Sequence, residues 1–321
     1  MSLPRQAKIL IAYPANVMER ALVGRLVWAG HHNLTLTRGL DLRDKEAVLA
    51  LFEAELPDYV FLMPARVCHS LSTQPARWMH DNLTSVANVI HAAYLYDVSK
   101  LLCLDCSATF MQPAVLPATA DHWTPETLGE TRRACAVTRV ATSELCDSYR
   151  VQYGCNFVHV VASHIYGPEL DFGLLGHPFV PTLVREVQRA AAGQAPELRL
   201  QGHESGHHDL LHLHDLTDAS VLLMEQGAAA GPATGPATGT VTVESGQGGT
   251  LGDITRLLTA AAGYGGALHF DERLPLGAAG DAPPGRAADL RELGWRPAVS
   301  LAHGLRDTWR WYSQEHAPRT S

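Results

Sequence analysis

The sequence lacks the features of membrane-inserted and nucleic-acid-binding proteins. No apolar run approaches the roughly 18 residues that a membrane-spanning helix needs. The apolar stretch Ile9–Ala12 is too short for the core of a signal peptide and is more typical of a first strand. Positive charge is also scarce, because 25 lysines and arginines stand against 33 aspartates and glutamates, a net charge of −8. We therefore expect a soluble, cytoplasmic protein that binds neither a membrane nor nucleic acid.

Cysteine is sparse as well. The six cysteines stand among apolar neighbours and do not follow the spacing of a small secreted disulfide framework. Cys103 and Cys106 form a C-x-x-C pattern, but on an extended strand a spacing of three directs the two side chains to opposite faces. Reduced structural thiols therefore explain the pattern better than a redox or metal site.

Apolar residues are abundant, at 46% of the 321 residues, and they alternate between two kinds of segment. Short apolar runs typical of buried strands are separated by longer segments with helical periodicity. The expected strands are 8–12, 34–37, 59–63, 100–106 and 157–162, and the expected helices are 17–29, 44–55, 82–96 and 134–153. This alternation predicts an α/β fold with a doubly wound parallel sheet of Rossmann type.

The rhythm becomes irregular after about residue 165. The change predicts two parts, a Rossmann-type domain over residues 1–165 and a smaller α/β lobe over residues 166–321, with some crossing of the chain between them. The natural role of such a lobe is to cover a ligand at the carboxyl ends of the strands.

Several ungapped blocks, in order along the chain, resemble the GDP-L-fucose synthase family of extended short-chain dehydrogenases/reductases. The blocks are DLRDKEAVLALFEAELPDYVF (41–61), NVIHAAY (88–94), YRVQYGCNF (149–157), YGP (166–168) and DLRELGWRPAVSLAHGLRDTWRWY (289–312). The resemblance implies a cofactor domain, a lobe that binds a GDP-sugar, and a homodimer. Fold does not fix chemistry, so each functional position has to be compared separately.

The cofactor turn departs from the family. The family has a G-x-x-G-x-x-G turn after its first strand, where glycines let the backbone approach the pyrophosphate. The matching positions here are Tyr13, Asn16 and Glu19. Each adds a side chain, and Glu19 also adds negative charge at the helix N-terminus that would receive the pyrophosphate. We therefore expect no NAD(P) cofactor.

The proton-transfer positions also differ. The family's Y-x-x-x-K pair aligns with Cys135 and Arg139, and its Ser-Ser-Cys aligns with residues 106–108. Its catalytic histidine falls beside His177, one residue out of register. Hydride transfer and the epimerisation coupled to it are therefore unsupported. The candidate acid–base residues are His164, His177, Asp105, Cys106 and Ser107.

The sugar-nucleotide positions are closer to the family. The resemblance implies that Phe179 and Leu183 hold the guanine and that Arg185 follows on the same helix. Gln201 stands where the family has a tryptophan near the base, and His208 replaces the arginine at the diphosphate, which reduces the positive charge there. The expected substrate-binding residues are Phe179, Leu183, Arg185, Gln201, His208 and Arg286.

A histidine-rich segment, residues 201–216, covers the place where that charge is lost. Imidazole and carboxylate groups beside phosphate oxygens suit Mn²⁺, Zn²⁺ or Mg²⁺. We therefore expect His207, His208 and Asp209 to bind a divalent metal, Mn or Mg. The alternative is that these histidines are exposed to solvent or bind the phosphates directly.

A GDP-sugar site without a hydride carrier favours non-redox chemistry at the sugar. The leading interpretation is an isomerase, a pyranose–furanose mutase of GDP-L-galactose, in which a metal or His and Arg groups stabilise the diphosphate. The sequence is also similar to a redox-silent GDP-L-galactose mutase of nucleoside-antibiotic biosynthesis. Two alternatives stay open: an epimerase of a GDP-4-keto-6-deoxysugar, and a non-catalytic GDP-sugar-binding partner subunit.

Overall fold

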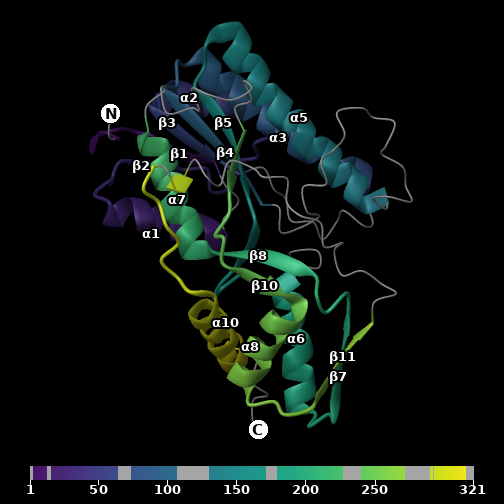
Figure 1. The fold of residues 1–321 in the computed structure, drawn as a ribbon. Helices are drawn as coiled ribbons and strands as arrows, with labels where there is room; N and C mark the ends of the chain where they lie inside the picture. The colour runs from purple at the N-terminus through teal and green to yellow at the C-terminus, as the bar shows by residue number, and fades with distance from the viewer. Residues whose placement is uncertain are drawn as a thin grey trace.

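The computed structural model describes residues 3–12, 16–63, 74–106, 130–170, 179–226, 240–271, 290–291 and 293–315. Figure 1 shows a sheet flanked by helices in the upper part of the molecule and a smaller lobe below. The strands are β1 (Ile9–Ala12), β2 (Leu34–Leu36), β3 (Tyr59–Leu62), β4 (Lys100–Cys106), β5 (Phe157–Ala162), β6 (His164–Tyr166), β7 (Glu197–Gln201), β8 (His207–His212), β9 (Thr240–Val243), β10 (Gly248–Thr250) and β11 (Ala267–Asp271). The helices are α1 (Val17–Trp28), α2 (Lys45–Glu55), α3 (Pro75–Leu95), α5 (Glu130–Tyr153), α6 (Phe179–Ala192), α7 (Leu213–Glu225), α8 (Leu251–Ala262) and α10 (Leu301–Glu315).

A six-stranded sheet in the order β2-β1-β3-β4-β5-β9 forms the upper part. Every pairing in this sheet is parallel. Strand β1 lies inside the sheet, with β2 on one side and β3 on the other, which is the topological switch point where open α/β sheets bind ligands. The predicted α/β fold with a parallel, Rossmann-type sheet is therefore confirmed.

The strands of this sheet are buried on both faces, which explains their continuous apolar runs. Alternate residues of β1 point to opposite faces. Ile9 and Ile11 join a core cluster with Leu22 of α1, whereas Leu10 joins a second cluster with Phe52 of α2 and residues of α3 and α5. Helices α1 and α7 thus cover one face of the sheet, and α2, α3 and α5 cover the other.

The lower part contains a three-stranded sheet, β10-β8-β6, a two-stranded parallel sheet, β11-β7, and helices α6, α8 and α10. Among the described residues, the chain passes between this part and the upper part from β5 to β6, from β8 to α7 and from β9 to β10. Ser163 alone separates β5 from β6, and β8 continues directly into α7, which packs beside α1. Tyr166 of β6 and Leu211 of β8 belong to the same core cluster as Ile9 of β1.

Local sequence explains how α1 and α8 begin. Thr250 and Asp253 form a capping box at α8, in which each side chain accepts a hydrogen bond from the other residue's backbone N–H. Helix α1 has a similar pattern, and the Asn16 Oδ1 atom accepts from the Glu19 N–H at 3.0 Å. The Glu19 carboxylate, however, accepts from Arg38 at the end of β2. The Glu19 carboxylate is therefore buried at the start of α1 and does not cap the helix.

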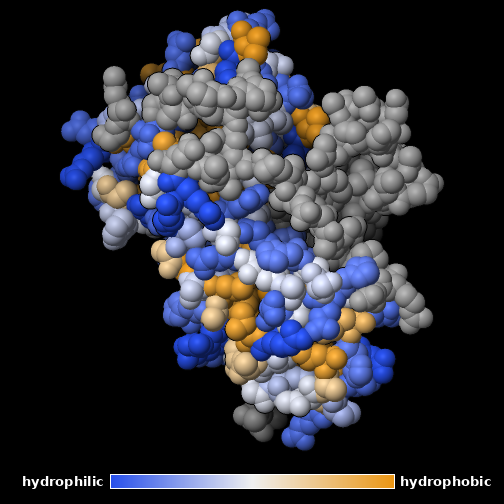
Figure 2. Space-filling model, viewed as in Figure 1, coloured by the Kyte–Doolittle hydropathy of each residue, from blue (hydrophilic) through white to orange (hydrophobic). Residues whose placement is uncertain are grey.

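The described part of the chain contains no helix that is long and apolar enough to cross a membrane. The face of the molecule in Figure 2 carries mainly hydrophilic side chains, and the apolar ones on this face gather mostly over the lower lobe.

Helix α10 approaches β6 most closely at Gly304. A Cβ atom at Gly304 would lie 2.4 Å from the Tyr166 hydroxyl oxygen, and Tyr166 is 1% exposed. We expect Gly304→Ala to lower the free energy of unfolding by roughly 1–3 kcal/mol, because the buried ring has no room to move. Urea unfolding measures this, with Gly24→Ala as the matched control, since a Cβ at Gly24 meets no described atom within 4 Å. Equal midpoints for the two variants would contradict the close packing.

Candidate active site

The first turn of α1 contains a buried carboxylate. Glu19 is 0% exposed, and its Oε1 atom accepts a hydrogen bond from the Arg38 Nε atom at 2.6 Å. The Arg38 Nη2 atom also contacts Oε1, and the Arg38 side chain is 54% exposed. Among the described residues, the Glu19 Oε2 atom has no hydrogen-bond partner. The N-terminus of α1, which attracts anions, is therefore already next to a negative charge supplied by the chain itself.

A second ion pair lies at the carboxyl end of β4. The Asp105 Oδ2 atom accepts from the Arg139 Nε atom at 2.7 Å, and the His159 Nε2 atom lies 3.6 Å from it. Burial by itself would raise the pKa of Asp105, but the Arg139 charge and the contacts with His159 and Arg139 outweigh burial and hold that pKa well below its usual value. Asp105 is thus ionised and paired, a state in which a carboxylate is a weak base.

Three aromatic side chains meet where β6, β8 and α6 come together. The rings of Phe179 and His208 are stacked, with centroids 4.0 Å apart and an angle of 24° between their planes. The His164 ring centroid lies 5.7 Å from that of Phe179 and 5.5 Å from that of His208. His164 begins β6 and lies two residues beyond Ala162, the carboxyl end of β5, where open α/β sheets bind ligands.

Both histidines of this group are neutral at pH 7. Burial lowers the pKa of His164. Burial, together with the charges that His164 and His207 would carry, lowers the pKa of His208 to about 4. Among the described residues, the His164 Nδ1 atom is buried without a hydrogen-bond partner. The group therefore offers uncharged imidazoles that can exchange hydrogen bonds with hydroxyl or phosphate oxygens.

The structure contradicts the predicted metal site at His207, His208 and Asp209. Neighbouring residues of β8 point to opposite faces of the sheet, so His207 is exposed while His208 is buried against Phe179. The described residues contain no group of three or more His, Cys, Asp or Glu side chains that could hold a metal ion.

Asp209 has structural partners in place of a metal. One of its carboxylate oxygens accepts from the Ser163 hydroxyl at 2.6 Å, and the other accepts from the Gly246 backbone N–H at 2.7 Å. Ser245 donates to the carboxylate through both its backbone N–H and its hydroxyl. The carboxylate thus ties β8 to the segments that follow β5 and β9.

The other predicted site residues lie in different surroundings. Leu183 of α6 is 0% exposed in the core, and Arg185 is partly buried with its Nη2 atom 3.5 Å from the Thr182 hydroxyl. Cys106 and Gln201 end β4 and β7, and only their backbones are described. Ser107, His177 and Arg286 lie outside the described residues.

The structure brings His164, Phe179 and His208 together, and it adds partners that the sequence reasoning does not identify. These partners are Arg38 for Glu19, His159 for Asp105, and Ser163 and Ser245 for Asp209. No short spacing signals any of these pairs.

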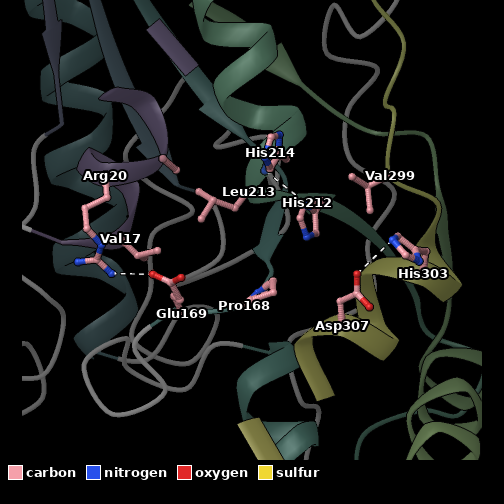
Figure 3. Close-up of a pocket in the computed structure, with 11 residues that line it drawn as sticks. Val17, Arg20, Pro168, Glu169, His212, Leu213, His214, Val299, His303 and Asp307 are labelled. Carbon is pink, nitrogen blue, oxygen red and sulfur yellow. Dashed lines mark hydrogen bonds and ion pairs between the residues drawn. The ribbon is translucent and has the colours of Figure 1, made fainter. Parts of the chain in front are cut away.

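A cavity of about 490 Å³ opens at the other end of β8 (Figure 3). An Arg20–Glu169 pair at 3.1 Å lies on one side, and a His303–Asp307 pair at 3.1 Å lies on the other. His212 lies between them, and burial lowers its pKa to about 4. His208 and His212 are separated by four residues of strand, about 13 Å, so the cavity is distinct from the aromatic group.

Comparison with known proteins identifies clear relatives. A model described as the NAD dependent epimerase/dehydratase family matches residues 19–234. The chain is 31% identical over 315 residues to GDP-L-fucose synthase 1 of Arabidopsis thaliana, covering 96% of this chain and 94% of that protein. It is 30% identical over 313 residues to GDP-L-fucose synthase of Escherichia coli K12, covering 95% and 96%.

Solved structures share the fold. A GDP-D-glycero-L-gluco-heptose synthase from Campylobacter jejuni, crystallised in the presence of NADPH, superposes with a TM-score of 0.80 at 22% identity, covering 97% of this chain and 99% of that chain. A GDP-mannoheptose C4 reductase from the same organism with NADP bound gives a TM-score of 0.75 at 23% identity, with coverage of 97% and 99%.

These comparisons confirm the resemblance to GDP-L-fucose synthases and overturn the predicted function. The relatives are GDP-L-fucose synthases, and the similar structures include a synthase and a reductase solved with NADPH or NADP. The prediction of an NAD(P)-independent GDP-L-galactose mutase that uses Mn or Mg is therefore wrong, and nothing in the comparisons supports a role in antibiotic biosynthesis. Substitution of three glycines was not sufficient evidence for a different class of reaction.

The family description implies a nicotinamide dinucleotide, and the start of α1 allows a test of the fit. A pyrophosphate at this turn would lie beside the buried Glu19 carboxylate, and like charges in a site shielded from water repel strongly. Arg139 is held by Asp105 at the β4 edge. As placed in the structure, these residues do not fit a dinucleotide pyrophosphate at the start of α1.

The lowered pKa of His208 predicts a pH dependence of stability. The folded protein protonates His208 near pH 4, whereas an unfolded chain does so near 6.5, so the unfolded state gains its proton first as the pH falls. Stability from this residue is therefore present above pH 6.5 and decreases between about 6.5 and 4. Replacing His208 with glutamine should remove roughly 1–2 kcal/mol of that decrease at pH 5.

Thermal unfolding at pH 7.5 and pH 5 measures the effect. The exposed His32 provides the control, because His32→Gln should leave the difference between the two pH values unchanged. If His208→Gln loses as much stability as the wild type between these pH values, the assignment of His208 as a buried neutral imidazole fails.

Proposed function

This chain belongs to the NAD dependent epimerase/dehydratase family, and from that premise we propose that it is an epimerase acting on a GDP-4-keto-6-deoxyhexose. The relatives that match over nearly the whole chain are named for GDP-L-fucose synthesis. The observation that carries the proposal is the partly buried, neutral imidazole of His164 beyond the carboxyl end of β5. Its ring centroid lies 5.7 Å from that of Phe179 on α6.

The chemistry is a proton transfer at a carbon next to the ketone. A base takes the proton, the C–H electron pair moves into an enolate, and a proton added on the opposite face forms the new C–H bond. No electrons are gained or lost overall, so this step needs a base and an acid on opposite faces of the sugar. His164 is unprotonated at neutral pH, the state that a base requires. His177, Cys106 and Ser107 are the proposed partners for the opposite face.

The remaining predicted residues are proposed to hold the GDP moiety. The Phe179 and His208 rings, which stack on each other and are each 6% exposed, are proposed to form one wall of the site for the base. Leu183 is buried and supports Phe179 from one turn further along α6. The Arg185 Nε atom is buried without a hydrogen-bond partner among the described residues, which suits a guanidinium that binds phosphate. Gln201 and Arg286 complete the proposed set.

A second candidate is a GDP-sugar-binding subunit without chemistry of its own. One observation favours it: the ion pair between Asp105 and Arg139 occupies two of the positions at which proton-transfer groups are expected. The two candidates differ in whether the protein exchanges a substrate proton.

We also propose that the protein is a homodimer formed through α3 and α5. These helices carry exposed apolar side chains at their C-terminal ends, where Leu95 is 49%, Val151 is 79% and Tyr153 is 47% exposed. Tyr94 of α3 stacks on Tyr153 with ring centroids 4.2 Å apart, so the exposed groups lie on adjoining surfaces. Burial of such a surface against a second copy would remove it from water.

Hydrogen exchange tests the epimerase proposal. In D₂O, the wild type should place deuterium on the carbons next to the ketone of a GDP-4-keto-6-deoxyhexose, observed by NMR, without added reductant. We expect His164→Gln to slow exchange at least tenfold, in the range of general base catalysis. The control is His203→Gln at an exposed position. Absence of exchange with intact GDP-sugar binding would support the binding subunit instead.

Light scattering after size-exclusion chromatography tests the dimer. Val151→Glu should convert the dimer to a monomer, because it places a charge in the proposed apolar interface. Trp28→Glu is matched in exposure, at 79%, but lies on α1 on the other face of the sheet, so it should leave the dimer intact. A wild-type monomer would end the proposal.

A further inference from the structure

Glu19 is an unusual residue for its position. It is the third residue of α1 and is completely buried, yet only one of its two carboxylate oxygens has a partner among the described residues. A buried charge that is incompletely hydrogen-bonded destabilises a fold, and a glutamine or an apolar residue of similar size avoids that cost. Helix capping does not explain the carboxylate either, because it bonds Arg38 and not the Asn16 backbone.

The residue that carries this carboxylate belongs to the first turn of a helix that can bind an anion. A helix N-terminus that follows the first strand of a Rossmann-type sheet attracts a phosphate through its free backbone N–H groups and its dipole. Glu19 places one full negative charge in that turn. An external phosphate there must either share the turn with Glu19 or displace it.

Arg38 is the cation that balances Glu19. It follows β2, the strand next to β1 in the sheet, and half of its side chain is exposed. An arginine beyond the second strand is suited to the 2′-phosphate that distinguishes NADP from NAD. While Arg38 holds Glu19, two of its guanidinium nitrogens are engaged by that carboxylate.

We infer that Glu19 is an internal competitor for dinucleotide phosphates: its carboxylate occupies both the α1 N-terminus and Arg38, so a dinucleotide binds only when Glu19 leaves. Glu19 then lowers the affinity of the protein for both dinucleotides. It lowers the affinity for NADPH more than that for NADH, because it also engages Arg38, the group suited to the 2′-phosphate that only NADPH carries. This inference depends on the dinucleotide of the family and not on the proposed sugar chemistry.

Direct titration of the full-length chain tests the inference without any measurement of turnover. We expect Glu19→Gln to bind NADPH at least tenfold more tightly than the wild type, in calorimetry or by NADPH fluorescence, with a smaller gain for NADH. Adding Arg38→Ala to Glu19→Gln should abolish the preference for NADPH. The control is Glu46→Gln, which removes a carboxylate from the first turn of the neighbouring helix α2 and should change nothing.

Two further measurements keep the test decisive. Thermal unfolding establishes that each variant is folded, and Glu19→Ser serves as a second, smaller replacement if the glutamine variant is unstable. GDP titrated into the same variants should bind as it does to the wild type, which separates this result from a failure of the sugar-nucleotide site. Equal or weaker NADPH binding by folded Glu19 variants would overturn the inference.

Discussion

A carboxylate that solvent does not reach lies in the first turn of α1, and among the described residues Arg38 is the group that neutralises it. This ion pair connects the helix N-terminus to the end of β2, beside the switch point of the sheet. Phosphate binding on this side of the fold depends on this ion pair. Glu19 offsets the positive potential of the α1 N-terminus and engages Arg38, the two features that a dinucleotide would use. The protein therefore keeps the fold of its family, while its own Glu19 side chain supplies a negative charge at the phosphate site.

The sugar-nucleotide side is electrostatically different. His164 is partly buried, His208 is buried, and both are neutral, while Phe179 stacks on His208, so this region offers hydrogen bonds and apolar contacts in place of charge. Asp209 does not add a free charge there, because serine and backbone donors satisfy it. The negative charges of a bound ligand would therefore be balanced by arginines such as Arg185. The two sides could respond independently to substitution, since separate strands and helices hold them.

Much of the upper sheet could be predicted from sequence, because strands buried on both faces leave continuous apolar runs such as Tyr59–Leu62 and Lys100–Cys106. Helix α3 begins at Pro75, well before the expected start at 82, since Arg77 and His80 interrupt the apolar pattern. The three-residue strands β6 and β10 are too short to show a period. In the site, the positions of Glu19 and Asp105 were foreseeable, but their arginine partners were not. Such pairs depend on how helices pack on strands, which no local spacing encodes.

The most direct test of the central claim is a crystal structure of the wild-type chain grown with NADPH at saturating concentration. We expect that wherever the dinucleotide pyrophosphate occupies the start of α1, the Glu19 carboxylate has left that turn and Arg38 contacts the 2′-phosphate. A pyrophosphate seated on the first turn of α1 with the Glu19–Arg38 pair intact would contradict it.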